Sequence, residues 1–161
     1  MVSAQDLEVV SEQLGRQVRG VLDIAARCVC GRPLVVKTAP QLPDGTPFPT
    51  LYYLTHPLAV AAASRLEAAG VMKTMNEDLQ SDEDLKAAYR KAHESYLADR
   101  LAVAKVPQIE GISAGGMPDR VKCLHVLFAH SLAKGPGVNP LGDRALELVT
   151  EQWSPSVCKC R

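Results

Sequence analysis

The stretch that decides the fold is GVLDIAARCVCGRPLVVKTA, residues 20–39. Residues 20–27 alternate so that one face is the more apolar, which is the pattern of a half-buried strand. Residues 33–39 are rich in β-branched side chains and predict a second strand after a short turn. TLYYLT, residues 50–55, predicts a third strand. The intervening PQLPDGTPFP favours a rigid turn, because its prolines and its Asp44-Gly45 pair forbid regular structure.

The rest of the chain shows mainly helical patterns. A capping-box pattern at Ser3 and Asp6 begins a first helix, which Gly15 can end. Further helices are predicted over residues 57–69, 71–79, 82–104, from about 118 to 133, and 144–153. We therefore expect a single α+β domain over residues 1–153, in which a small antiparallel sheet of about three strands packs against a layer of helices. Residues 154–161 are expected to form a flexible C-terminal tail.

Composition excludes several classes of protein. Lys+Arg and Asp+Glu balance at 18 each, so the chain lacks the broad positive charge of a nucleic-acid binder. No run of 18 apolar residues exists, which predicts no membrane partner and no membrane-spanning helix. The N-terminal residues do not resemble a secretory signal. We expect a cytoplasmic protein whose five cysteines stay reduced.

The turn between the first two strands carries Cys28 and Cys30. In an antiparallel meander, the end of strand one, the start of strand two and the end of strand three lie at the same end of the sheet. His56 directly follows the third strand, so it should converge with the two cysteines. Three such donors favour zinc, which takes four nitrogen or sulfur ligands in a structural site.

The fourth zinc ligand is expected to be Cys123. A helical wheel places Cys123 near Leu127 and His130, and points His125 away; His130 is the alternative fourth ligand. A [2Fe–2S] cluster is the alternative cofactor. Ordinary buried cysteines or redox chemistry are the competing interpretations of Cys28 and Cys30. The second Cys-x-Cys pair, Cys158 and Cys160, lies in a polar tail, where an incidental pair is more typical.

A second candidate site lies in GISAGGMPDRVK, residues 111–122. If Pro118 begins a helix after the glycine pair, the first N–H groups of that helix are free to bind an anion. The expected anion-binding residues are Ser113, Gly115, Gly116, Arg120 and Lys122. A plain helix cap is the alternative, because Asp119 can already satisfy the helix dipole. The stretch matches neither of the common glycine-rich nucleotide-binding motifs.

RCVCGRPLVVKTAPQLPDGTPFPTLYYLTHP and GISAGGMPDRVKCLHVLFAHSLAKGPGVNPLGD resemble the bacterial domain-of-unknown-function family 501, which is common in actinobacteria. The resemblance covers roughly residues 12–150 and brings no known activity. Cysteine is frequent in that family where this chain has His56; a metal ligand would permit that exchange, although it weakens the iron–sulfur interpretation. The family's genes often lie beside enolase, a septum-formation initiator and an exopolyphosphatase. This neighbourhood implies a protein partner in cell division or polyphosphate metabolism.

Two classes of function follow. The favoured one is a metal-stabilised interaction or adaptor protein, because no general base or nucleophile is evident. Ser113 and Ser131 have no visible base partner, so a hydrolase triad has no support. The alternative is an enzyme or sensor that binds a phosphorylated or carboxylated small molecule at the Gly115-Gly116 loop.

Overall fold

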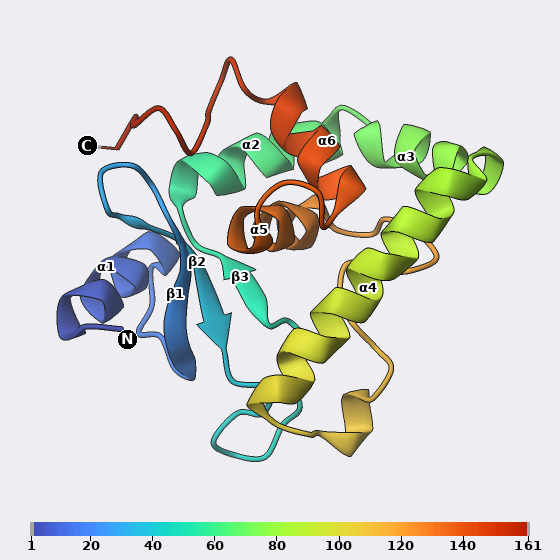
Figure 1. Ribbon diagram of the computed structural model, residues 1–161. Coiled ribbons are helices and arrows are strands. Elements are labelled where there is room, and N and C mark those ends of the chain that lie inside the picture. The colour runs from blue at the N-terminus through green and yellow to red at the C-terminus, as the bar shows by residue number, and fades with distance from the viewer. Residues whose placement is uncertain (1, 161) are drawn as a thin grey trace.

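The computed structural model describes residues 2–160 of the chain. Its sheet has the predicted antiparallel meander, in the order β1–β2–β3. The strands are β1 (Val21–Arg27), β2 (Pro33–Thr38) and β3 (Tyr52–Leu54). The turn that joins β1 to β2 therefore lies at the same end of the sheet as the start of the helix that follows β3 (Figure 1).

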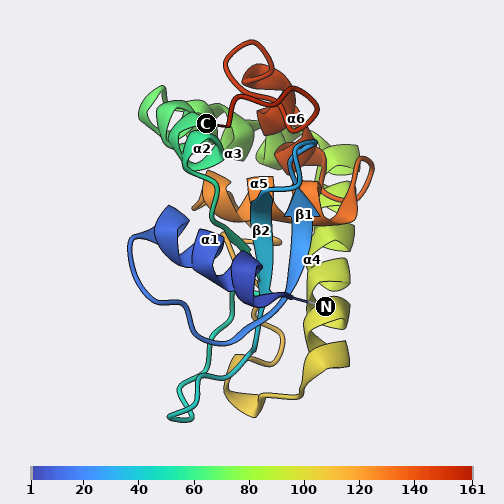
Figure 2. The same ribbon diagram turned by 90° about the vertical axis from the view of Figure 1, so that its left-hand side faces the viewer.

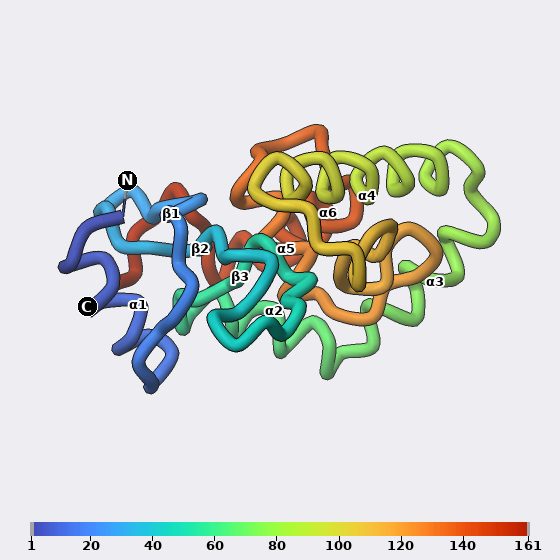
Figure 3. The backbone as a smooth tube through the Cα atoms, turned by 90° about the horizontal axis from the view of Figure 1, so that it is seen from below, coloured from blue at the N-terminus to red at the C-terminus, as the bar shows by residue number. Residues whose placement is uncertain are grey.

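Helices lie on both faces of this sheet, so the predicted α+β class is confirmed. They are α1 (Ala4–Leu14), α2 (Pro57–Ala68), α3 (Val71–Ser81), α4 (Glu83–Val103), the short 3-10 helix η1 (Pro107–Ile109), α5 (Leu124–Lys134) and α6 (Pro140–Leu148). Figure 2 shows α1 in front of the strands and α5 behind them. Seen from below, α3, α4 and α6 lie on the side of the molecule away from α1 (Figure 3).

Local cap chemistry accounts for several helix ends. Ser3 and Asp6 form the predicted capping box at the start of α1. Gly15 ends α1 at a φ of 70°, a left-handed conformation that glycine adopts without steric cost. At the start of α2, the His56 side chain accepts a hydrogen bond from the backbone N–H of Leu58, and Pro57 occupies the first helical position.

The core lies around α5, which packs on the sheet and on helices α2 and α6. Leu127 and Phe128 of α5 are fully buried, as is Val35 of β2. Tyr96 of α4 is also fully buried, and its hydroxyl oxygen accepts a hydrogen bond from the backbone N–H of Leu51 at 2.7 Å. This bond attaches the long helix α4 to the residue directly before β3 and satisfies a buried polar group on each side.

The predicted helix start at Pro118 is wrong, because α5 begins at Leu124. Before it the chain folds back on itself, and the N–H groups of Arg120 and Lys122 donate to the carbonyls of Gly116 and Gly115 respectively. The side-chain amide of Asn76 in α3 makes two hydrogen bonds to the backbone of Val121. Its oxygen accepts from the N–H of Val121 at 2.7 Å, and its nitrogen donates to the carbonyl of Val121 at 3.1 Å. These bonds hold the segment out of the helix.

None of the helices within residues 2–160 combines the length and the apolar character needed to cross a bilayer.

Candidate metal centre

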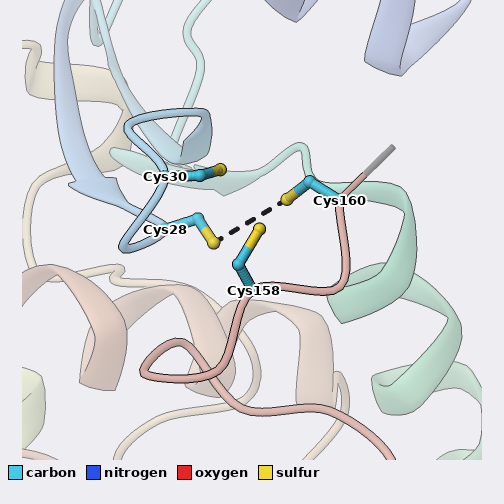
Figure 4. A group of neighbouring side chains, drawn as sticks. All are labelled: Cys28, Cys30, Cys158 and Cys160. Atoms are coloured by element: carbon cyan, nitrogen blue, oxygen red, sulfur yellow. Dashed lines mark hydrogen bonds between the residues drawn. The ribbon is translucent and has the colours of Figure 1, made fainter.

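Four cysteines from opposite ends of the chain converge at one end of the sheet. Cys28 and Cys30 lie in the turn between β1 and β2, and Cys158 and Cys160 lie in the C-terminal segment. Their sulfur atoms all lie within 4.8 Å of one another. Figure 4 shows the four side chains pointing toward a common centre.

The β1–β2 turn is held by its own backbone. The N–H of Cys28 donates to the carbonyl of Arg32 at 2.9 Å, and the N–H of Gly31 donates to the carbonyl of Cys28 at 2.8 Å. Gly31 has a φ of 93°, which disfavours any side chain there. This tight turn keeps the two thiols of the Cys-x-Cys pair on one side.

The C-terminal segment, which was expected to be a flexible tail, folds back over this turn. Trp153 is only 2% exposed and anchors the start of the segment. The N–H of Val29 then donates to the carbonyl of Pro155 at 3.4 Å. Further along, the Lys159 ammonium donates to the carbonyl of Gln152 at 2.7 Å. The segment is therefore curled so that its two cysteines face Cys28.

The sulfur spacing suits one tetrahedral ion. Zinc–sulfur bonds of about 2.3 Å place two sulfurs of a tetrahedral site about 3.8 Å apart. The Sγ atoms of Cys28 and Cys160 are 3.7 Å apart. A disulfide would need about 2.05 Å between its sulfurs, and all five cysteines are free.

The four thiols differ in how readily they ionise. The backbone N–H of Arg32, followed by the neighbouring thiols, lowers the pKa of Cys30 to about 7. Burial raises the pKa of Cys28. Burial, together with the adjacent thiols, also raises the pKa of Cys160. Close thiols cannot all become thiolates without a cation among them, so a divalent ion would favour ionisation of all four.

His56 lies beside this cluster. Its Nδ1 accepts the N–H of Leu58 at 3.3 Å, which leaves the ring proton on Nε2. Nε2 lies 3.0 Å from the Cys160 sulfur, so His56 is placed to donate a hydrogen bond to that sulfur. Burial, and then the charge of Arg32, lowers the pKa of His56 and keeps the ring neutral.

The predicted ligand set was Cys28, Cys30, His56 and Cys123. The structure brings the first three to one place, but it puts Cys123 in a different cluster. Cys123 departs from the helical wheel because it is the residue before the first turn of α5, with an extended backbone (φ −147°, ψ 112°). Its side chain therefore does not follow the helical periodicity and lies beside His125, which the wheel had pointed away.

Cys158 and Cys160 are not among the ligands that the sequence predicts. The signal was present, because their Cys-x-Cys spacing repeats that of Cys28 and Cys30. The polar character of the tail had favoured an incidental pair. His130, the alternative ligand, is fully buried, and its Nδ1 lies 3.1 Å from the side-chain nitrogen of Asn139.

The predicted anion-binding residues line one hollow of about 480 Å³. They are Ser113, Gly115, Gly116, Arg120 and Lys122, with Asp119 beside them. Ser113 is nearly fully buried, and its hydroxyl lies 2.7 Å from Nδ1 of His93. The free helix N-terminus that motivated the site is absent, since the N–H groups of Arg120 and Lys122 are bonded within the loop. Anion binding stays a prediction that rests on the two cations.

Comparison with known proteins shows to which family the chain is related. No curated protein and no solved structure matches the chain. Residues 24–147 match the family described as "Protein of unknown function (DUF501)". This match spans more than half of the chain and includes Cys28 and Cys30, whereas Cys158 and Cys160 lie beyond it. The chain therefore belongs to the DUF501 family.

Proposed function

We propose that this chain is a zinc-clamped, non-catalytic adaptor, in which one ion ties the C-terminal segment to the β1–β2 turn and fixes a surface for another protein. The observation that carries the proposal is the meeting of four cysteine sulfurs, within 4.8 Å of one another, from two distant segments. Four thiolates complete a tetrahedral shell and leave no position for a substrate.

Zinc suits the cluster better than the alternative [2Fe–2S] centre. In such a cluster two cysteines bind each iron, so sulfurs bound to different irons lie further apart than sulfurs around a single ion. All four cysteine sulfurs lie within 4.8 Å of one another, and the 3.7 Å between Cys28 and Cys160 is that expected around one tetrahedral ion. A hydrogen bond from His56 to the Cys160 sulfur would orient that ligand in the way outer-shell groups do.

Two exposed apolar side chains flank the cysteines and support the adaptor role. Val29, between Cys28 and Cys30, is 65% exposed, and Val157, next to Cys158, is 57% exposed. A metal ion would hold both segments, and therefore both valines, in fixed positions. Preorganised apolar groups reduce the entropy cost of binding a partner.

Metal analysis tests the clamp. Protein purified without added metal should lose about one equivalent of zinc when Cys158 and Cys160 are both replaced by serine. The matched control is Ser154→Ala with Ser156→Ala, which alters the same segment and should keep the metal. An unchanged zinc content in the double cysteine variant, or iron with visible absorbance in the wild type, contradicts the zinc clamp.

Binding assays test the adaptor role. The partners to try are purified septum-formation initiator and exopolyphosphatase proteins, the candidates that the family's gene neighbourhood implies. Val29→Glu and Val157→Glu should weaken binding while zinc is retained. Leu101→Glu, which alters an equally exposed residue on α4, should not. If neither protein binds the zinc-loaded chain, or if both valine variants bind as the wild type does, the adaptor role is wrong.

A further inference from the structure

A second cluster of donor atoms lies away from the four cysteines. It joins Glu67, near the end of α2, to Cys123 and His125 at the start of α5. Each residue contributes one donor atom, and these atoms lie within 4.8 Å of one another. We propose that Glu67, Cys123 and His125 form a second zinc site, with three protein ligands and one exchangeable position.

The distances within the cluster are those of ligands around an ion. Nδ1 of His125 lies 3.8 Å from the Cys123 sulfur and 3.3 Å from each carboxylate oxygen of Glu67. Tetrahedral zinc with ordinary bond lengths would separate nitrogen from sulfur by about 3.6 Å and nitrogen from oxygen by about 3.4 Å. Direct N–H···O hydrogen bonds are usually shorter, at about 2.7 to 3.2 Å.

A metal-free catalytic triad fits this arrangement less well. In such a triad the nucleophile meets one ring nitrogen of the histidine and the acid orients the other. Here the thiol of Cys123 and the carboxylate of Glu67 both approach Nδ1 of His125. Nδ1 alone cannot take the proton of Cys123 and also be oriented by Glu67. One metal ion, by contrast, can be bound by all three side chains.

The surrounding hydrogen bonds prepare the ligands for an ion. Nε2 of His125 lies 3.1 Å from the hydroxyl of Ser64. If Nε2 carries the proton and donates it to this oxygen, the lone pair of Nδ1 is free for a metal, as in many metal-bound histidines. The backbone N–H of Leu124 donates to Glu67 at 2.9 Å and fixes the carboxylate. Glu67 and His125 therefore each have a hydrogen-bond partner outside the cluster.

The charge state of the cluster agrees with this geometry. Burial alone would raise the pKa of Cys123, but hydrogen bonds from His125 and from the N–H of Val126 outweigh it, and the pKa of Cys123 is lowered. The hydrogen bond to Cys123, followed by the charge of Glu67, raises the pKa of His125. A lowered pKa favours the thiolate of Cys123, which is the form that binds zinc.

An apolar hollow of about 390 Å³ lies beside the cluster. Cys123 and His125 form part of its wall, together with Tyr52, Tyr53, Leu54 and Val60. The side chains of Glu67 and His125 are 25% and 28% exposed, so small molecules can reach the site from solvent. Three protein ligands leave one position open on a tetrahedral zinc ion, where water or a donor atom of a ligand can bind. The chemical class of ligand is a carboxylate or thiol attached to an apolar body.

Metal stoichiometry of the full-length chain tests the site independently of the cysteine clamp. We expect wild-type protein to bind two zinc ions, and expect both Cys123→Ser and Glu67→Gln to bind one fewer. Cys158→Ser with Cys160→Ser should also bind one fewer, by losing the other ion. Glu77→Gln on α3 is the matched control and should keep both ions. Thermal unfolding and circular dichroism establish that each variant is folded.

Two further measurements separate a metal site from a structural cluster. Ser64→Ala should weaken zinc binding at this site by about 10- to 100-fold, since it removes an outer-shell partner. In the cobalt-substituted protein, added mercaptoethanol should change the visible spectrum of the clamp-deficient double variant, because its remaining ion has an open position. Zinc content unaffected by both Cys123→Ser and Glu67→Gln would overturn the proposal. So would a cobalt spectrum that mercaptoethanol does not alter.

Discussion

Breaking the cysteine clamp should destabilise the protein by an amount that follows from the length of chain it closes. The ion would join Cys28 to Cys160, which are 132 positions apart. Cross-linking a loop of that length removes conformational entropy from the unfolded chain, worth about 5 kcal/mol at 25 °C. Each Cys-x-Cys pair retains some affinity for zinc in the unfolded chain, which lowers the effect. We therefore expect about 3 to 5 kcal/mol for Cys158→Ser with Cys160→Ser.

The assay is guanidinium unfolding of four samples: the wild type and the double variant, each with zinc and with a chelator. The zinc-loaded wild type should exceed the zinc-loaded variant in free energy of unfolding by about 3 to 5 kcal/mol. With chelator the two should agree within about 1 kcal/mol, because serine and cysteine differ little at an unbound site. The second proposed zinc site is present in both proteins and cancels from this comparison. A wild type no more stable than the variant in zinc would refute the clamp.

Three further predictions concern other parts of the molecule. Burial lowers the pKa of His130 to about 4, so the unfolded chain binds more protons between about pH 6.5 and pH 4. His130 should then reduce stability by about 1.4 kcal/mol per pH unit as pH falls through that range, and unfolding titrations of His130→Gln should show a shallower slope. A side chain on Gly142 would overlap the backbone and a hydroxyl of α5; Gly142→Ala should lower stability by about 2 kcal/mol in thermal melts, despite alanine's better helix propensity. Phosphate or carboxylates should raise the melting temperature of the wild type and of Arg16→Ala, but not of Arg120→Ala; equal shifts in all three would remove the anion site.

Short-range chemistry determined most of the secondary structure. The alternation in residues 20–27, the β-branched run in 33–39 and the stretch 50–55 predicted three strands, which the structure forms at Val21–Arg27, Pro33–Thr38 and Tyr52–Leu54. The capping box at Ser3 and the glycine at 15 marked the ends of the first helix. These signals are readable in the sequence because each depends on groups only a few residues apart. The meander in turn predicted that His56 would approach the cysteine turn.

The candidate sites depended on contacts that no local pattern specifies. Cys28 meets Cys160 because the chain after α6 turns back over the sheet's end, a placement fixed by burial of Trp153 and by backbone hydrogen bonds. Asn76, far along the chain, holds Val121 extended and so delays the start of α5. The packing of the whole core decides which distant residues make these contacts. The local sequence does not, because many segments of similar composition could close loops of the same length at a similar cost in conformational entropy. The sequence alone therefore determined the strands, most of the helices and one Cys-x-Cys turn, whereas tertiary packing decided which residues complete each site.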